Sequence, residues 1–278
     1  MTPISATVTH PDGRRVGYAL WGDPQSRLPV VVHCHGTPGS RIPMYPVEMP
    51  EEHVHVMLDR PGWGLSDPLP GRQAADHAGD VAAVLDELGI DAFSALGWSG
   101  GVGPALGLGA GLPARVRRIV VGAGRAPVDS PVFPTAMRDE ILGDLEKDRA
   151  DCEQMARLFR ESPDSYWAEM ESWLPPDELE KFRSQRPQFS AMLTAAFENG
   201  GEGWFEDDVQ LVTPWGFDLG DVRCEVQLWH GLDDGMVPPD NGRWLAEQLP
   251  RCEAHFVEGE GHGSLQRLLP DMCRWLAG

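Results

Sequence analysis

The sequence predicts an α/β fold, in which helices cover both faces of a mostly parallel sheet. Short, continuous apolar runs, typical of strands buried on both faces, alternate with stretches of helical periodicity along most of the chain. The 278 residues, 41% of them hydrophobic, are enough to bury one large core. The alternation stops once, between residues 127 and 219, which indicates an insertion into the fold.

The first elements should form a hairpin. Residues 6–9 and 15–21 alternate in polarity on either side of a Pro-Asp-Gly turn at 11–13. The short apolar runs predict strands at 29–33, 54–58, 93–96, 118–122, 226–230 and 254–258. Helical periodicity between these runs predicts helices at 74–88, 101–110, 241–249 and 263–276.

The interruption at 127–219 has a composition of its own. It contains no clear buried strand, but it holds amphipathic helical stretches and four tryptophans. With 21 acidic and 8 basic residues, it supplies −13 of the chain's net charge of −20. We interpret it as a helical cap inserted over the sheet, with residues 1–126 and 220–278 forming the core domain.

Charge and cysteine content exclude several function classes. Nucleic acids and anionic membrane surfaces attract basic proteins, so a chain of net charge −20 is not expected to bind either. The five cysteines are odd in number and show no ligand spacing, so we expect no metal and no cofactor. Because no apolar run has the length of a signal peptide or membrane span, we expect a cytoplasmic protein.

The sharpest chemical signal is the turn Gly97-Trp98-Ser99-Gly100-Gly101, which follows an expected strand and opens an expected helix. A turn this tight strains its central residue and needs small neighbours, and it lifts the serine hydroxyl above the strand ends. The Gly100 N–H then lies beside any developing oxyanion. The alternative is a glycine-rich turn that only packs a helix against the sheet, so the strand and helix around Ser99 carry the functional interpretation.

A nucleophilic serine needs a base and an acid that orients the base. Asp234 lies on the loop after the strand at 226–230, and His262 lies on the loop after the strand at 254–258. Asp233 is a rival for the acid. The order Ser, Asp, His along the chain fits a triad at the carboxyl ends of parallel strands. We expect structural or surface roles for the histidines at 10, 53, 55, 77, 230 and 255.

These motifs and three others give the chain a resemblance to the α/β-hydrolase superfamily along nearly its whole length. Residues 35–40 (HGTPGS) look like its HG-x-P oxyanion loop, 59–66 (DRPGWGLS) like its D-x-P-G-x-G-x-S loop, and 231–238 (GLDDGMVP) like its acid loop. The resemblance implies an eight-stranded sheet with a helical cap after the sixth strand. It selects Asp234 as the acid and implies an oxyanion hole formed by the N–H groups of Thr37 and Gly100. His35 and Asp59 would organise loops.

The resemblance also narrows the chemistry. A serine nucleophile argues against haloalkane dehalogenases and most epoxide hydrolases, and the turn is not the GGSWGG-like form of proline iminopeptidases. We therefore expect a serine hydrolase that cleaves an ester, lactone or related acyl bond. An aminopeptidase, a carbon–carbon bond hydrolase and a non-catalytic receptor remain alternatives.

The substrate should be a small acyl compound with an apolar part, and the protein a monomer or homodimer. Candidate substrate-binding residues are Trp98, Trp167, Trp173, Trp204 and Phe205. For any single aromatic residue of the cap, a place in the cap's own core is the competing interpretation.

Overall fold

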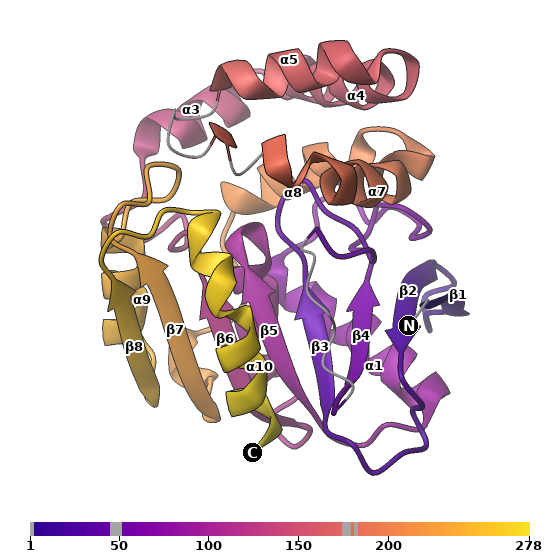
Figure 1. The fold of residues 1–278 in the computed structure, drawn as a ribbon, viewed down its shortest axis with the longest axis vertical. Coiled ribbons are helices and arrows are strands. Elements are labelled where there is room, and N and C mark those ends of the chain that lie inside the picture. Colours follow the sequence, from indigo (N-terminus) through magenta and orange to yellow (C-terminus); the bar gives the residue numbers. More distant parts are fainter. Residues whose placement is uncertain (1–2, 45–51, 174–178, 181–182) are drawn as a thin grey trace.

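The structure is a computed structural model that describes residues 3–44, 52–173, 179–180 and 183–278. An eight-stranded sheet lies at its centre, in the order β1-β2-β4-β3-β5-β6-β7-β8 (Figure 1). The strands are β1 (Ile4–Thr9), β2 (Arg15–Trp21), β3 (Val30–Cys34), β4 (Val54–Leu58), β5 (Phe93–Trp98), β6 (Val116–Gly122), β7 (Glu225–Gly231) and β8 (Cys252–Val257). This architecture confirms the α/β-hydrolase fold expected from the sequence.

The sheet is antiparallel at one edge and parallel elsewhere. β1 pairs with β2 and β2 with β4 in antiparallel register, so the expected hairpin is the first edge of the sheet. The strands from β4 through β3, β5, β6 and β7 to β8 pair in parallel, so their carboxyl ends lie at one edge. Such an edge is where α/β proteins gather functional side chains.

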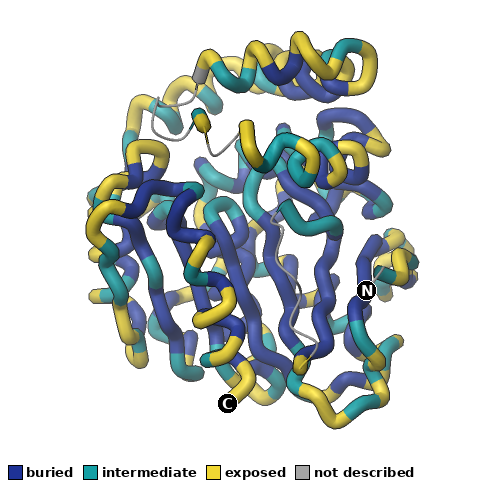
Figure 2. The backbone as a smooth tube through the Cα atoms, viewed as in Figure 1, coloured by how far each residue is buried: buried dark blue, intermediate teal, exposed yellow. Residues whose placement is uncertain are grey.

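Helices cover both faces of the sheet. Residues of α1 (His77–Leu88), α2 (Val102–Gly111) and α9 (Asp240–Gln248) share one large apolar core with the strands. Residues of α10 (Leu269–Ala277) form a second core on the other face. In Figure 2 the inner strands β2 to β7 are buried along most of their length, whereas the edge strands β1 and β8 are largely exposed or half-buried.

Two expected helices begin later than their periodicity suggests. The stretch at 263–276 starts as a 3-10 turn, Ser264–Leu268, and the α-helix begins only at Leu269. Pro270 occupies the first turn of α10, where the missing N–H has no intrahelical partner to lose. The stretch at 74–88 likewise opens as a 3-10 turn, Ala74–Asp76, before α1, and Gly89 ends it with φ 68°.

Beyond the carboxyl ends of the central strands lies what we call the helical layer (Figure 1). It consists of α3 (Thr135–Gly143), α4 (Leu145–Glu161), α5 (Pro163–Trp173), α7 (Arg186–Ala196) and α8 (Glu202–Leu211). Its apolar side chains form a core of their own, which also includes Trp63 from the loop after β4. The division into a core domain and an independent cap remains a prediction. Among the described residues, no helix is both long and apolar enough to cross a membrane.

Candidate active site

The turn predicted to carry the nucleophile joins β5 to α2. Ser99 directly follows β5 and has φ 52°, a conformation that non-glycine residues rarely adopt and that costs of order 1–3 kcal/mol. A Cβ on Gly97 would lie 2.6 Å from that of Ala105, and one on Gly101 would lie 2.1 Å from the Cys34 carbonyl oxygen. The turn therefore needs both glycines, and its tightness holds Ser99 in the strained conformation.

The loops after β7 and β8 bring the expected acid and base together. His262 Nδ1 lies 2.8 Å from Asp234 Oδ2. The other carboxylate oxygen of Asp234 accepts the N–H groups of Met236 at 2.9 Å and Val237 at 2.8 Å, which fixes the carboxylate. Asp234 is 4% exposed, whereas the rival Asp233 is an exposed side chain. The geometry thus favours Asp234 as the partner of His262.

The protonation of this pair follows from its contacts. Burial raises the pKa of the Asp234 carboxyl, but the hydrogen bond and charge of His262 and the Val237 N–H outweigh burial, so the pKa lies below its usual value. The ionised carboxylate can only accept, so His262 Nδ1 donates. That tautomer leaves His262 Nε2 able to accept a proton, as a general base requires.

A second histidine, His230, lies behind the acid, and the sequence predicted only a structural or surface role for it. His230 is 1% exposed, and its Nε2 lies 2.9 Å from the Val237 carbonyl oxygen and 3.6 Å from Asp234 Oδ2. Burial lowers its pKa, so it is neutral and donates to the carbonyl. Its position at the end of β7, four residues before Asp234, was the sequence signal that could have predicted this contact with the acid loop.

The two expected oxyanion donors are neighbours. A Cβ on Gly100 would lie 3.3 Å from the backbone nitrogen of Thr37 and 2.5 Å from Thr37 Oγ1, so the loop after β3 approaches the turn at Ser99 closely. Thr37 lines both cavities that Ser99 lines, and Gly100 lines the polar one. Their placement agrees with a shared role in binding an oxyanion.

A buried ion network holds the Thr37 loop from the helical layer. Asp207 of α8 pairs with Arg60 and Arg72, and it accepts the hydroxyl of Thr37. Arg60 also donates to Gly36 O at 3.0 Å and to Thr37 Oγ1 at 3.1 Å. Burial raises the pKa of Asp207, but the two guanidinium groups outweigh it and hold the pKa well below its usual value. Asp207, which lies 170 residues from Thr37 in sequence, thereby fixes the position of this loop.

The residues expected to organise loops lie where such a role requires. Asp59 accepts the Leu65 N–H at 2.9 Å and forms a 2.8 Å ion pair with Arg41. Burial raises its pKa to about 6, despite Arg41. His35 Nε2 accepts the Arg60 N–H at 3.3 Å while Nδ1 donates to Gly36 O at 2.8 Å, which joins the loops after β3 and β4.

Two cavities meet at Ser99, and Ser99, Thr37, Met236 and His262 line both. The apolar cavity, of about 160 Å³, extends under α7 and the Thr37 loop and is lined mainly by aliphatic and aromatic side chains. The polar cavity, of about 210 Å³, extends under α8 and is lined by Arg125, Asp207 and Asp208, among others. A reacting group at Ser99 would therefore have one apolar and one polar side.

Comparison with known proteins agrees with this geometry. The model of a family described as the alpha/beta hydrolase family matches residues 31–271. The chain belongs to this family.

Curated relatives of this α/β hydrolase are named as hydrolases. It is 25% identical to a 2-hydroxy-6-oxononadienedioate/2-hydroxy-6-oxononatrienedioate hydrolase of Dechloromonas aromatica, over 74% of this chain and 69% of the relative. It is 29% identical to a 2-hydroxymuconate semialdehyde hydrolase of Pseudomonas putida, with the same coverage. An enzyme with hydrolase activity is therefore supported.

Solved structures share the fold. An esterase from Rhodococcus sp. ECU1013 superposes with a TM-score of 0.73 at 20% identity, covering 99% of each chain. The enol-lactonase from Burkholderia xenovorans LB400 superposes with a TM-score of 0.71 at 17% identity, covering 97% of this chain and 96% of its own. At these identities the likeness concerns the fold alone.

The candidate substrate-binding aromatic residues divide between the cavities and the helical layer. Trp98 lines the apolar cavity and Trp204 the polar one. Trp167 and Phe205 line neither, because Trp167 packs in the core of the helical layer and the Phe205 ring lies 4.0 Å below the Arg149 guanidinium. The side chain of Trp173 lies outside the described residues.

Sequence patterns missed most of the apolar cavity. Its wall includes Met170 of α5, Phe189 and Met192 of α7, and Met57 of β4. Phe189 and Met192 are three residues apart on one helix face, which was a usable signal for a shared surface.

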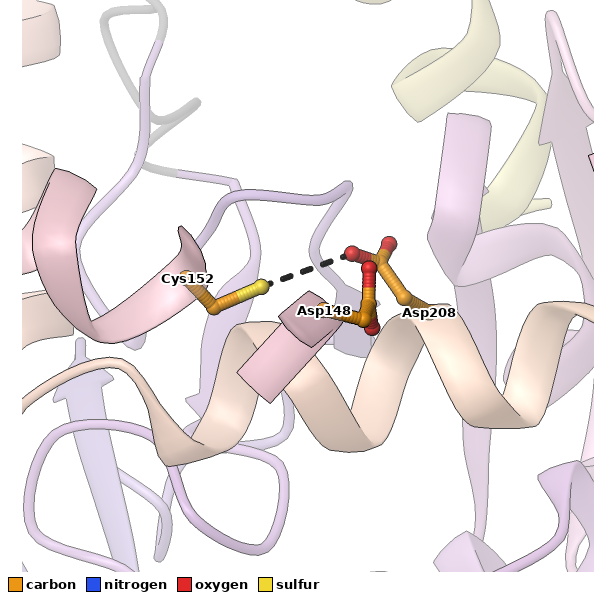
Figure 3. A group of neighbouring side chains, drawn as sticks. All are labelled: Asp148, Cys152 and Asp208. Atoms are coloured by element: carbon orange, nitrogen blue, oxygen red, sulfur yellow. Dashed lines mark hydrogen bonds between the residues drawn. The ribbon is translucent and has the colours of Figure 1, made fainter. Parts of the chain in front are cut away.

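A cysteine and two carboxylates form a group at the edge of the polar cavity (Figure 3). Asp148 and Cys152 lie one turn apart on α4 and face Asp208 of α8, with their ligand atoms within 4.8 Å of one another. The Cys152 thiol donates to Asp208 at 3.6 Å. Burial raises the pKa of that thiol, so in the absence of a metal ion the cysteine holds its proton.

This group should make the stability of the protein depend on pH. Burial, with Asp148 and Asp207 nearby, raises the pKa of Asp208 to about 8 from 3.8. The folded state then holds a proton that the unfolded state releases, so this group's contribution to stability falls as the pH rises from about 4 to about 8. Asp208→Asn lacks this titrating carboxyl. We therefore expect the Tm of Asp208→Asn, minus that of the wild type, to increase as the pH rises from about 5 to about 9. A difference that does not change with pH would contradict the assignment.

Proposed function

We propose that this α/β hydrolase cleaves a carboxylic ester, lactone or related acyl bond through an acyl-enzyme on Ser99. The observation that carries the proposal is the 2.8 Å contact between His262 and Asp234 beside a strained serine that lines the same two cavities. Nucleophile, base and acid from three separate loops converge there, which a glycine-rich packing turn alone does not require.

The proposed reaction has two halves. Ser99 Oγ attacks the carbonyl carbon and His262 Nε2 takes its proton, while Asp234 stabilises the imidazolium. The N–H groups of Thr37 and Gly100 would bind the oxyanion, and losing one such donor typically costs about 3 kcal/mol of barrier. Collapse of the intermediate breaks the acyl–oxygen bond, and His262 returns the proton to the leaving oxygen. Water, deprotonated by His262, then releases the acid and restores Ser99.

The cavities support a small substrate with an apolar part. About 160 Å³ lined mainly by methionine, isoleucine and aromatic side chains fits a short acyl or aryl group and not a polymer. We also propose a cytoplasmic protein, as a monomer or homodimer, without nucleic-acid or membrane partners.

Turnover of p-nitrophenyl esters tests the proposal. We expect the purified protein to hydrolyse p-nitrophenyl butyrate with saturation kinetics, and one equivalent of a fluorophosphonate to abolish the activity. Full activity after reaction with the fluorophosphonate would contradict a catalytic serine, whereas ligand binding without turnover would favour a receptor. Aminoacyl p-nitroanilides in the same panel test the peptidase alternative, which a clear preference for them would support.

Carbon–carbon bond hydrolysis is the second candidate, because the curated relatives bear the names of such enzymes. The same triad would serve both reactions, so the substrate separates them. We expect kcat/KM for p-nitrophenyl butyrate to exceed that for 2-hydroxymuconate semialdehyde. The reverse order, by more than about tenfold, would favour the second candidate.

A further inference from the structure

Arg125 is a cationic side chain at the candidate active site whose guanidinium is not in contact with a carboxylate in the described part of the chain. It is half-buried and lines the polar cavity together with Ser99 and His262. Its guanidinium donates to the Met236 carbonyl oxygen at 3.2 Å, and among the described residues it forms no ion pair. Arg60 and Arg72, in contrast, both pair with Asp207. A guanidinium that is partly withdrawn from water without a carboxylate is an unsatisfied binding group.

The segment that presents Arg125 is held on both sides. Ala123, directly after β6, has φ 52°, and its N–H donates to the Trp229 carbonyl oxygen at 3.0 Å. The Ala126 N–H donates to Oδ1 of the buried Asn241 at 3.0 Å. The backbone of Arg125 is thus positioned from β7 and α9 before any ligand arrives, which lowers the entropic cost of binding.

The acidic residues in the same wall do not cancel this charge. Asp207 is matched by two guanidinium groups, so the group Arg60, Asp207 and Arg72 is itself positive. The pKa of Asp208 is raised to about 8 by burial, with Asp148 and Asp207 adding to it, so its carboxyl is neutral at pH 7. The charge of Asp234 also acts on Arg125, but the two form no ion pair, and the Asp234 carboxylate is already bound by His262 and by the N–H groups of Met236 and Val237.

We propose that Arg125 binds a carboxylate of the substrate in the polar cavity, while the apolar part of the substrate occupies the apolar cavity on the other side of Ser99. The natural substrate is then an ester or lactone that bears a second, free carboxylate. The guanidinium can hold such a group through two parallel hydrogen bonds, which would also orient the scissile carbonyl at Ser99. This inference rests on the proposed function, since it names the substrate class of the same site.

Matched substrates test the inference. Mono-p-nitrophenyl glutarate carries a carboxylate on the acyl chain and 4-butyryloxybenzoate carries one on the leaving group, and p-nitrophenyl butyrate and phenyl butyrate are their neutral counterparts. We expect the wild type to prefer at least one charged ester to its neutral counterpart. Arg125→Gln should reduce that preference in kcat/KM by about 10- to 100-fold, and Arg125→Lys by less. An unchanged preference in Arg125→Gln, or none in the wild type, would overturn the inference.

Two controls isolate the local effect. Arg251→Gln removes the same charge from an exposed side chain that pairs with Glu225, and it should leave the preference as in the wild type. Binding of mono-p-nitrophenyl glutarate to Ser99→Ala and to Ser99→Ala/Arg125→Gln, measured by calorimetry, needs no turnover. A Kd weakened about tenfold or more in the double variant would support the carboxylate site even if ester hydrolysis fails, and equal Kd values would contradict it.

Discussion

Replacing Ser99 with alanine is expected to lower kcat for p-nitrophenyl butyrate by about a million-fold, to the level set by binding and the oxyanion donors. The reason is that, among the described residues that line both cavities, the other hydroxyl belongs to Thr37 and already donates to Asp207. Asp234→Asn should lower kcat by about ten-thousand-fold, because an amide no longer holds His262 in the tautomer that exposes Nε2 to Ser99.

The neighbouring acid supplies the control. Asp233→Asn removes the same charge one residue away, from an exposed side chain that does not contact His262, and it should leave kcat near the wild-type value. Because the triad acts as a unit, the double variant Ser99→Ala/Asp234→Asn should be no slower than Ser99→Ala alone. Stopped-flow or steady-state release of p-nitrophenol measures all four proteins. Equal losses in Asp233→Asn and Asp234→Asn would contradict the assignment of the acid.

Replacing Asp207 with alanine is expected to lower the free energy of unfolding by about 3–5 kcal/mol. Arg60 and Arg72 are 1% and 3% exposed, so the substitution would leave two buried guanidinium groups without their carboxylate. It would also remove the acceptor of the Thr37 hydroxyl and so loosen one oxyanion donor. Urea unfolding followed by tryptophan fluorescence measures the loss.

An exposed aspartate gives the comparison for this loss. Asp221 lies 3.9 Å from Arg223, with both side chains mostly exposed, and Asp221→Ala should change stability by less than about 0.5 kcal/mol. A change of the same small size in Asp207→Ala would show that the buried network contributes little to stability.

The sequence predicted the core fold because its signals are local. An apolar run of five residues before a glycine-rich turn specifies a buried strand and its end, and parallel pairing then places Asp234 and His262 at the same edge as Ser99. The late start of α10 was also readable, since Pro270 belongs in a first helical turn.

The support of the site could not be predicted in this way. Asp207 and Arg60 are 147 residues apart, and an ion pair between distant segments leaves no periodic trace in either one. The role of Arg125 could not be predicted either, because it depends on which carboxylates the fold brings near its guanidinium. Helical periodicity in residues 127–219 indicated apolar helix faces, but it could not show what each face contacts. Trp167 packs against Phe159 and Phe189 instead of lining a cavity.

The most direct test of a nucleophilic Ser99 is the site of a covalent adduct. After reaction with a fluorophosphonate, the protein should gain the mass of one phosphonyl group, and peptide mass spectrometry should place it on Ser99 in the turn between β5 and α2. Ser99→Ala should gain no mass under the same conditions. An adduct on another residue, or equal labelling of Ser99→Ala, would contradict the assignment of Ser99 as the nucleophile.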